Sequence, residues 1–189
     1  GLVISMATSI VMTVILMKKF GQEELTDSKN VKAKEEIKLI DAQPNVVYAP
    51  LSGTIRPVGE CSDPMFASKA MGDGVVITPE EGTLVSPVSG KVMMVFPTKH
   101  AIGLQGENGE EILIHVGLDT VSLDGAPFDV KVKDGDLIRA GQVLMQIDLD
   151  AIRKAGLSTE TPVVITNGKT FESMHDQEVK CCDQMLRLA

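Results

Sequence analysis

The sequence predicts an all-β domain, an antiparallel β-sandwich or barrel with at most short helices. From Val46 onward, short runs of Val, Ile and Leu alternate with Ser-Gly, Gly-Asp-Gly, Asn-Gly and Asp-Gly turn signals, as in proteins built from many short strands. The 17 glycines and 9 prolines interrupt the 189 residues at short intervals. A Pro-x-Ser-Gly turn leading into an apolar strand occurs twice, as APLSGTI at 49–55 and SPVSGKV at 86–92, which indicates duplicated β-hairpin units.

The expected strands follow the apolar runs in chain order. They cover residues 46–56, 73–78, 89–96, 101–106, 111–116, 127–132, 142–148 and 162–166. One short helix is expected over 150–156, because Asp150 is a suitable N-cap and Gly156 a suitable end.

The first 17 residues are uncharged and almost wholly apolar, and Lys18-Lys19 follow them. No positive segment precedes them, unlike in a signal peptide. A complete membrane helix needs about 20 residues. We therefore expect residues 1–18 to be the end of a transmembrane helix, a remnant of a membrane domain, with the lysine pair on the cytoplasmic side. A buried core helix is the alternative.

Three further regions follow this apolar segment. Residues 19–43 are charged and poor in hydrophobic residues, so a solvated linker is expected. The β-domain should occupy residues 44–167. Residues 168–189 form an atypical, weakly patterned tail.

Charge and cysteine content exclude several classes of protein. The net charge of −8, the single Tyr and the absence of Trp argue against nucleic-acid binding. The three cysteines are Cys61 and the adjacent pair Cys181-Cys182. This odd number suits neither a disulfide scaffold nor a cysteine-type zinc site, so a reducing compartment is expected.

Two of the three histidines, His100 and His115, flank an Asn-Gly turn signal. A two-residue turn at Asn108-Gly109 would pair Glu107 with Glu110, and therefore Ile102 with His115. In that register the two imidazoles are diagonal neighbours on one face of the hairpin, about 7–8 Å apart. The register places further residues on the same face: Thr98, Ile102, Leu104 and Leu113. A slip of one residue would separate the histidines.

The residue types near the histidine pair limit its chemistry. Catalytic zinc takes three protein ligands, so Asp119 or Glu111 would have to supply the third, and no HExxH spacing is present. No nucleophile motif of a serine or cysteine triad occurs, and acidic neighbours should raise the pKa of Cys61. Two histidines without another nucleophile suit phosphoryl transfer. One ring nitrogen would attack phosphorus and the other imidazole would donate hydrogen bonds to phosphoryl oxygens.

The sequence also resembles the glucose-type IIA domain of the bacterial phosphoenolpyruvate-dependent sugar phosphotransferase system, over about residues 46–167. The similar stretches are APLSGTI, DPMFASKAMGDGVVITP, SPVSGKV, TKHAIGL, GEEILIHVGLDTVSLDGAPF, VKDGDLIRAGQVLMQIDLDAI and TPVVITN. The resemblance implies a β-sandwich phosphocarrier that accepts phosphate from phosphorylated HPr and passes it to a IIB domain for sugar uptake. It implies no cofactor and no metal.

The resemblance also implies roles for individual residues. His115 would be phosphorylated on Nε2, His100 would support it, and Thr98 would orient His100. The Gly117 carbonyl and Asp119 would belong to the same site. Partners would dock on an apolar rim formed by Phe66, Met71, Phe96, Leu113 and Val121, with Asp63 at its edge; Leu113 stands where an aromatic residue is frequent.

In fused sugar permeases of the sucrose, β-glucoside or trehalose kind, a IIA domain follows the last membrane helix of IIC, as residues 1–43 suggest here. The domain would then lie on the cytoplasmic side of the cell membrane, or in the cytoplasm if released, and sugar would be met only through IIB and IIC. Two other functions stay open: a regulatory module that binds proteins through the same face according to its phosphorylation state, and a zinc hydrolase.

The tail departs from the resemblance. Family members continue into a closing strand with a Gly-Asp-apolar pattern, whereas residues 168–189 show no such pattern. A missing strand would expose a sheet edge and weaken the fold. His175 is expected to be a solvated bystander, and no role follows for Cys181 and Cys182.

Overall fold

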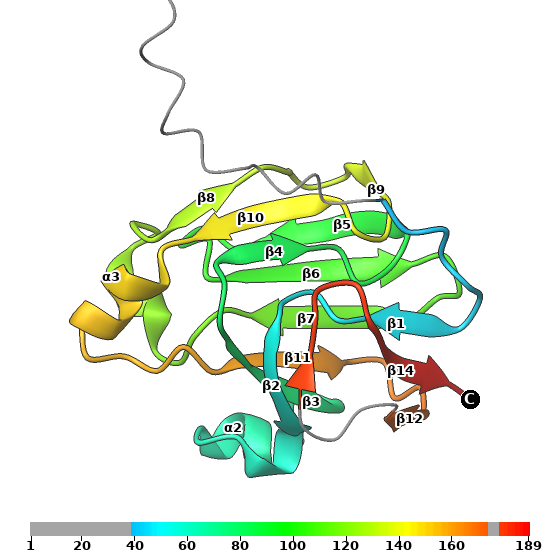
Figure 1. Ribbon diagram of the computed structural model, residues 1–189, viewed down its shortest axis with the longest axis horizontal. Coiled ribbons are helices and arrows are strands. Elements are labelled where there is room, and N and C mark those ends of the chain that lie inside the picture. Colours follow the sequence, from blue (N-terminus) through cyan, green and yellow to red (C-terminus); the bar gives the residue numbers. More distant parts are fainter. Residues whose placement is uncertain (1–38, 174–177) are drawn as a thin grey trace, which may run out of the picture. The chain divides into compact units, whose positions relative to one another are not determined.

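The computed structural model describes residues 39–173 and 178–189, which fold into antiparallel sheets with short helices, as expected (Figure 1). The expected membrane helix at 1–18 and most of the linker at 19–43 lie outside the described residues. Within the described part of the chain, no helix is long and apolar enough to cross a membrane.

The largest sheet has eight strands in the order β13-β2-β3-β11-β7-β6-β5-β9. Their bounds, in that order, are Glu178–Val179, Gly53–Pro57, Asp73–Pro79, Thr161–Ile165, Glu111–His115, Ala101–Gly106, Gly90–Val95 and Leu137–Ile138. All neighbouring pairs are antiparallel.

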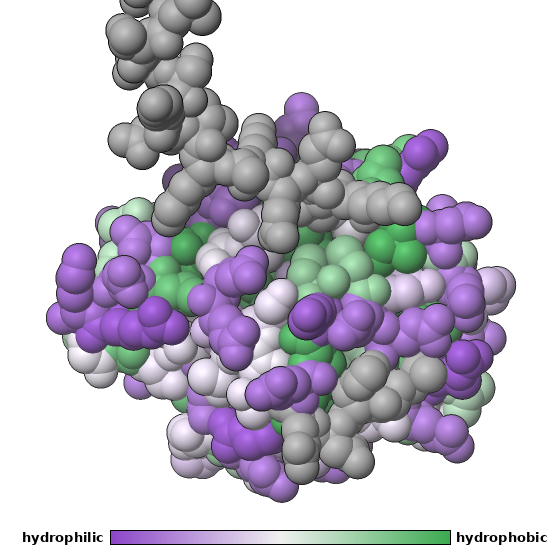
Figure 2. Space-filling view, viewed as in Figure 1, coloured by the Kyte–Doolittle hydropathy of each residue, from purple (hydrophilic) through white to green (hydrophobic). Residues whose placement is uncertain are grey.

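Two three-stranded sheets complete the part of the structure that is described, in the orders β1-β14-β12 and β4-β10-β8. Their bounds are Val46–Tyr48, Gln184–Leu188 and Phe171–Ser173 for the first, and Thr83–Val85, Val143–Ile147 and Phe128–Val130 for the second. Within the described residues, four short helices connect strands: η1 (Val58–Glu60), α2 (Pro64–Ala67), η2 (Thr120–Leu123) and α3 (Leu149–Lys154). On the face seen in Figure 2, polar side chains line much of the periphery.

The core lies between one face of the large sheet and the two small sheets. Because successive strand residues point to opposite faces, Ile112 and Ile114 of β7 enter this core while Leu113 and His115 face away from it. A second apolar cluster covers that other face and contains Val58, Cys61, Phe66, Val76, Leu118 and Val164, with Leu113 packed against it. The histidine region therefore stands beside a small secondary core.

The two Pro-x-Ser-Gly segments make equivalent contacts, which confirms the duplicated units. The N–H of Ala49 donates to the Asp183 carbonyl at 2.8 Å, and the N–H of Cys182 donates to Ala49 at 2.9 Å. In the second unit, Ser86 donates to Gln142 at 2.8 Å and Gly141 donates to Ser86 at 2.9 Å. Each segment is thus bound to a tight turn that leads into a strand of a small sheet.

The tail supplies the closing strand whose sequence pattern it was expected to lack. Strand β14 pairs with both β1 and β12, and near the carboxyl end it lies beside β1 (Figure 1). Met185 and Leu186 are 0% exposed and belong to the main core. The Gly-Asp-apolar pattern of the closing strand is present with cysteine in place of glycine. Cys182 precedes Asp183 and adopts a positive φ of 76°, a conformation that glycine usually takes.

Other expected boundaries also changed. The side chain of Asp148, and not that of Asp150, caps α3 by accepting from the Ala151 N–H at 2.9 Å. Asp150 instead pairs with Arg153 on the helix surface. The expected strand 46–56 is two strands, β1 and β2, because the Pro-x-Ser-Gly turn falls between them. Strands β4 and β9 were not expected, since they have three and two residues.

Candidate functional site

The hairpin that joins β6 and β7 has a three-residue loop, so the expected register was wrong by one position. Ala101, and not Ile102, lies opposite His115. The Gly109 N–H donates to the Gly106 carbonyl at 2.9 Å, and Gly109 has a φ of 79°. This is a tight turn closed by a left-handed residue, the common three-residue hairpin. A two-residue turn at Asn108-Gly109 does not form.

The two histidines nevertheless meet, with ring centroids 4.8 Å apart. His100 precedes β6, in a loop where Lys99 has a φ of 57°, so strand alternation does not dictate where its ring points. The Val116 N–H donates to the His100 carbonyl at 2.7 Å and holds the two backbones together.

The new register also separates the residues that were expected on the histidine face. Ile102 and Leu104 point into the main core, so their expected placement was wrong. Leu113 does share a face with His115.

The ring of His115 is oriented by Gly117. Its Nδ1 lies 2.7 Å from the Gly117 carbonyl oxygen, which can only accept, so Nδ1 carries the proton and Nε2 keeps its lone pair. Gly117 has a φ of 71°, and a Cβ there would meet Cγ2 of Thr120 at 2.5 Å. Glycine at this position is therefore required by the turn that presents the carbonyl.

His100 is oriented by Thr98, whose Oγ1 lies 2.6 Å from Nδ1. His100 is 8% exposed, and the Phe96 ring packs on it in a T-shaped arrangement with centroids 5.5 Å apart. When the Thr98 hydroxyl donates to Nδ1, Nε2 of His100 carries a proton that it can donate.

Burial lowers the pKa of both imidazoles below their ordinary value. For His100 burial is the main cause, and the neighbouring His115 adds to it. For His115 burial again dominates, although the Gly117 hydrogen bond and the charges of Asp63 and Asp119 act in the opposite direction. Both rings are therefore neutral at neutral pH, which suits one as a nucleophile and the other as a hydrogen-bond donor.

The two predicted carboxylates lie on different elements. Asp63 caps α2 and accepts from the Met65 N–H at 2.7 Å. Asp119 is exposed, with a φ of 58°, and directly precedes η2. The charges of both carboxylates favour a protonated His115 electrostatically.

Two of the predicted rim residues, Phe66 and Phe96, contact the histidine rings. Phe66 is buried, with its ring centroid 5.2 Å from that of His115, and Leu113 is half-buried against the secondary core. Met71 and Val121 remain 40% and 52% exposed, which is unusual for large apolar side chains.

Sequence reasoning missed one apolar residue next to this rim. Met94 is 49% exposed and lies opposite Gly103, which in turn lies opposite Leu113. Because Gly103 has no side chain, Met94 and Leu113 flank an uncovered position on the same face of the sheet. The bulge between Val92 and Met94 reverses the strand alternation there, and the sequence carries no clear signal of it.

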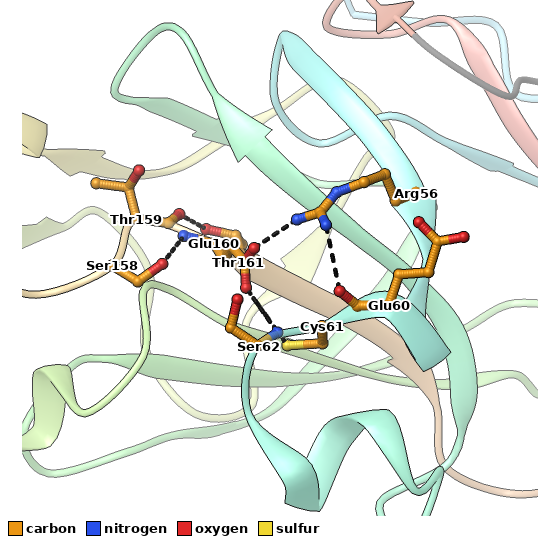
Figure 3. A network of polar contacts seen from close by, with 8 residues as sticks. All are labelled: Arg56, Glu60, Cys61, Ser62, Ser158, Thr159, Glu160 and Thr161. Carbon is orange, nitrogen blue, oxygen red and sulfur yellow. Dashed lines mark hydrogen bonds and ion pairs between the residues drawn. The ribbon is translucent and has the colours of Figure 1, made fainter.

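A polar network holds the segment that carries Asp63 and Phe66 (Figure 3). The Glu160 carboxylate pairs with Arg56 and accepts from the Ser62 N–H at 2.9 Å. On the other side, the Ser158 hydroxyl accepts from the Glu160 N–H at 3.1 Å, and the Ser158 carbonyl accepts from Leu118 at 3.0 Å. The network thus connects α2 to the loop that follows Gly117.

The alternative chemistries find no support in the described residues. Among them, no group of three or more His, Cys, Asp or Glu could hold a metal ion, so neither Asp119 nor Glu111 completes a zinc site with the histidines. Burial, aided by the charge of Glu160, raises the pKa of Cys61 and outweighs the opposing hydrogen bond with the Asp63 backbone, as expected for an unreactive thiol.

A β-sandwich that presents two neutral, oriented histidines within an apolar rim defines a phosphoryl-carrier type of domain. The chain belongs to the family described as phosphoenolpyruvate-dependent sugar phosphotransferase system, EIIA 1, whose profile matches residues 45–171. It is therefore a phosphocarrier domain of this system, a phosphotransferase component that acts through a phosphohistidine.

Two relatives illustrate the two contexts in which such domains occur. The glucose-specific EIIA component of Staphylococcus epidermidis is 48% identical over 149 residues, covering 79% of this chain and 87% of that protein. The glucose-specific EIICBA component of Staphylococcus carnosus is 48% identical over 155 residues, covering 81% of this chain. The chain spans only 23% of the length of that second protein.

A solved structure agrees with the fold. The glucose permease IIA from Mycoplasma capricolum superimposes with a TM-score of 0.71 at 42% identity, covering 75% of this chain and 93% of that one.

Proposed function

We propose that His115 takes the phosphoryl group from phosphorylated HPr on Nε2 and passes it to a IIB domain. The observation that carries the proposal is the 2.7 Å contact between its Nδ1 and the Gly117 carbonyl, which leaves Nε2 as the free nucleophile. Burial lowers the pKa of the ring, so this nitrogen is unprotonated at neutral pH. In the transfer, the bond from phosphorus to the donor breaks as the bond to Nε2 forms.

His100 supports the transferred group in this proposal. Its ring stands 4.8 Å from that of His115, and Thr98 fixes its orientation. A proton on Nε2 of His100 donates to a phosphoryl oxygen, where negative charge is concentrated in both ground and transition states. The same hydrogen bond steadies the phosphoryl group while the domain exchanges one partner for the other.

The apolar rim of Phe66, Met71, Phe96, Leu113 and Val121 docks both partners. Such a surface excludes water from the labile phosphohistidine, and its modest size allows the partners to dissociate between transfers. The charges of Asp63 and Asp119 at its edge favour partners with basic surfaces and speed their association.

The proposed context is a fused permease. The apolar segment at 1–18 followed by a charged linker fits the junction with a membrane domain, and it would hold the domain at the cytoplasmic face of the membrane. A released domain would act in the cytoplasm. The similar proteins named glucose-specific make glucose the first sugar to test, whereas a sucrose or trehalose permease stays a prediction.

Incubation with phosphoenolpyruvate, enzyme I and HPr tests the proposal. We expect an acid-labile, base-stable phosphate on His115 that His115→Ala abolishes. We expect His100→Gln to accept phosphate but to pass it poorly to a IIB domain, because the hydrogen bond to the phosphoryl oxygen changes. Absence of phosphate on a folded protein, shown to be folded by circular dichroism, would refute the phosphocarrier role of this chain.

A further inference from the structure

The turn that carries Cys181 and Cys182 is one of three copies of the same turn. In each, the first residue donates its N–H to the side chain of the fourth, and the fourth donates its N–H back to the carbonyl of the first. The copies are Lys133–Asp136, Arg139–Gln142 and Lys180–Asp183. The third residue is left-handed in every copy, with φ of 87°, 82° and 76°, and it is Gly135, Gly141 and Cys182 respectively.

The duplicated units show which residues of the other unit correspond to the two cysteines. The Cys181 N–H donates to the Ser52 hydroxyl at 3.0 Å, as the Ala140 N–H donates to the Ser89 hydroxyl at 3.2 Å. Cys181-Cys182 therefore stand where the other unit has Ala140-Gly141. The turn needs neither thiol, and Cys182 occupies a backbone conformation that disfavours any side chain.

The turn brings the two thiols together. Consecutive side chains of an extended strand point to opposite faces, which keeps their ends apart. Here the left-handed conformation at Cys182 turns both thiols to the same side, with Sγ atoms 3.6 Å apart. Both residues are half-buried free cysteines, so the pair is organised before any ligand binds and is still reachable from solvent.

We propose that Cys181 and Cys182 form a chelating dithiol site for trivalent arsenic compounds. With phenylarsine oxide the reaction is a condensation. Two arsenic–sulfur bonds form, the arsenic–oxygen bond breaks, and both thiol protons leave with the oxygen as one water molecule. Arsenic stays trivalent throughout, so no oxidant or reductant is needed.

The surroundings of the two cysteines favour arsenic binding over redox exchange and over binding of a divalent metal ion. Burial, with the neighbouring Cys182 and the charges of Glu81 and Asp183, raises the pKa of Cys181 to about 12. A neutral thiol is a poor nucleophile toward peroxides and disulfides, so the pair is unsuited to rapid redox exchange. A divalent metal ion would have to expel both protons into solvent, whereas the oxide of the arsenical takes them up as water.

Titration of the folded chain with phenylarsine oxide, under an excess of a monothiol, tests the proposal. Intact-mass analysis should show one adduct per chain, equal to one reagent less one water. A dithiol should remove it and the monothiol should not. Cys61→Ala should bind normally, because Cys61 lies in the secondary core.

Replacement by the residues of the other unit provides the matched control. Cys181→Ala combined with Cys182→Gly should fold as well as the native chain and form no adduct. Each single variant should bind at least about 100-fold more weakly, since the second bond of a chelate forms at high effective concentration. Equal binding by Cys182→Gly, or an adduct that forms only after unfolding in urea, would overturn the proposal. The site is independent of the phosphocarrier role, so phosphorylation of His115 does not enter this test.

Discussion

Replacement of Glu160 by glutamine tests how the polar network positions the site. Glu160 is 9% exposed, and its carboxylate serves Arg56 and the Ser62 N–H together. Glutamine keeps one oxygen for the Ser62 N–H but loses the charge and presents an amide to the guanidinium. The change therefore removes one charge-assisted contact with little change of volume.

The magnitude follows from the exposure of the partners. A hydrogen bond to a charged group contributes about 1.5–3 kcal/mol, and the Arg56 side chain is 33% exposed, which reduces its share of the ion pair. We expect a loss of about 2 kcal/mol in the free energy of unfolding, or roughly 4–8 °C in Tm for a domain of this size. Because the segment with Asp63 and Phe66 loosens, KM for phosphorylated HPr should rise more than kcat falls.

The pH dependence of the stability difference distinguishes loss of the Glu160 charge from a change in packing. Hydrogen bonds from Ser62 and Arg56 outweigh the effect of burial and lower the pKa of Glu160. Its stabilisation is thus present above pH 4.5 and is lost as the pH falls through the lower, folded value. Urea unfolding at neutral and acidic pH should show the difference between Glu160→Gln and the native chain shrinking in acid. A loss below about 0.5 kcal/mol at pH 7, or one that is unchanged in acid, would refute the reasoning.

Three further predictions concern the histidines, the closing strand and the strained turn. Burial lowers the pKa of His100 and His115 from 6.5, so the free energy of unfolding should fall as the pH drops below 6.5. The fall should be at most about 1.4 kcal/mol per pH unit for each ring. Replacing both histidines by glutamine should make the free energy of unfolding in urea nearly constant between pH 7.5 and 5.5. Leu186→Ala should lower the free energy of unfolding in urea by about 2–5 kcal/mol, because Leu186 is fully buried in β14. A smaller loss than that of the surface change Arg187→Ala would contradict the packing of β14 on the core. Cys182→Gly should raise Tm, because it removes a side chain from a left-handed backbone conformation that costs about 1–2 kcal/mol. This gain exceeds the entropy cost of glycine, about 0.5–1 kcal/mol. A fall in Tm would argue against strain at Cys182.

Local patterns in the sequence determined the class of fold and singled out the two histidines as the candidate site. Short apolar runs between turn residues predicted an antiparallel β-protein, because strand alternation and turn chemistry act over a few neighbouring residues. The duplicated Pro-x-Ser-Gly turns correctly indicated repeated units. His100 and His115 could be assigned to one place because one hairpin connects them.

Tertiary structure decided the geometry of that place. The loop at Glu107–Gly109 could close with two residues or three. The register follows because the core-facing residues of β6 lie directly opposite Ile112 and Ile114, and both sets are buried together. The histidines meet through the loop before β6 and not through the predicted register. A pattern of neighbours cannot distinguish such closely similar hairpins.

Contacts between distant segments were decided by tertiary structure alone. Arg56 and Glu160 are 104 residues apart, yet together they hold the segment beside His115. Strand β14 closes the sheet against β1 although its turn carries cysteine where the other copies carry glycine. The sequence by itself determined which residues are apolar, flexible or chemically active, because these are properties of single residues and their neighbours. Which of them touch was decided only when burial of the shared core brought separate segments into one structure.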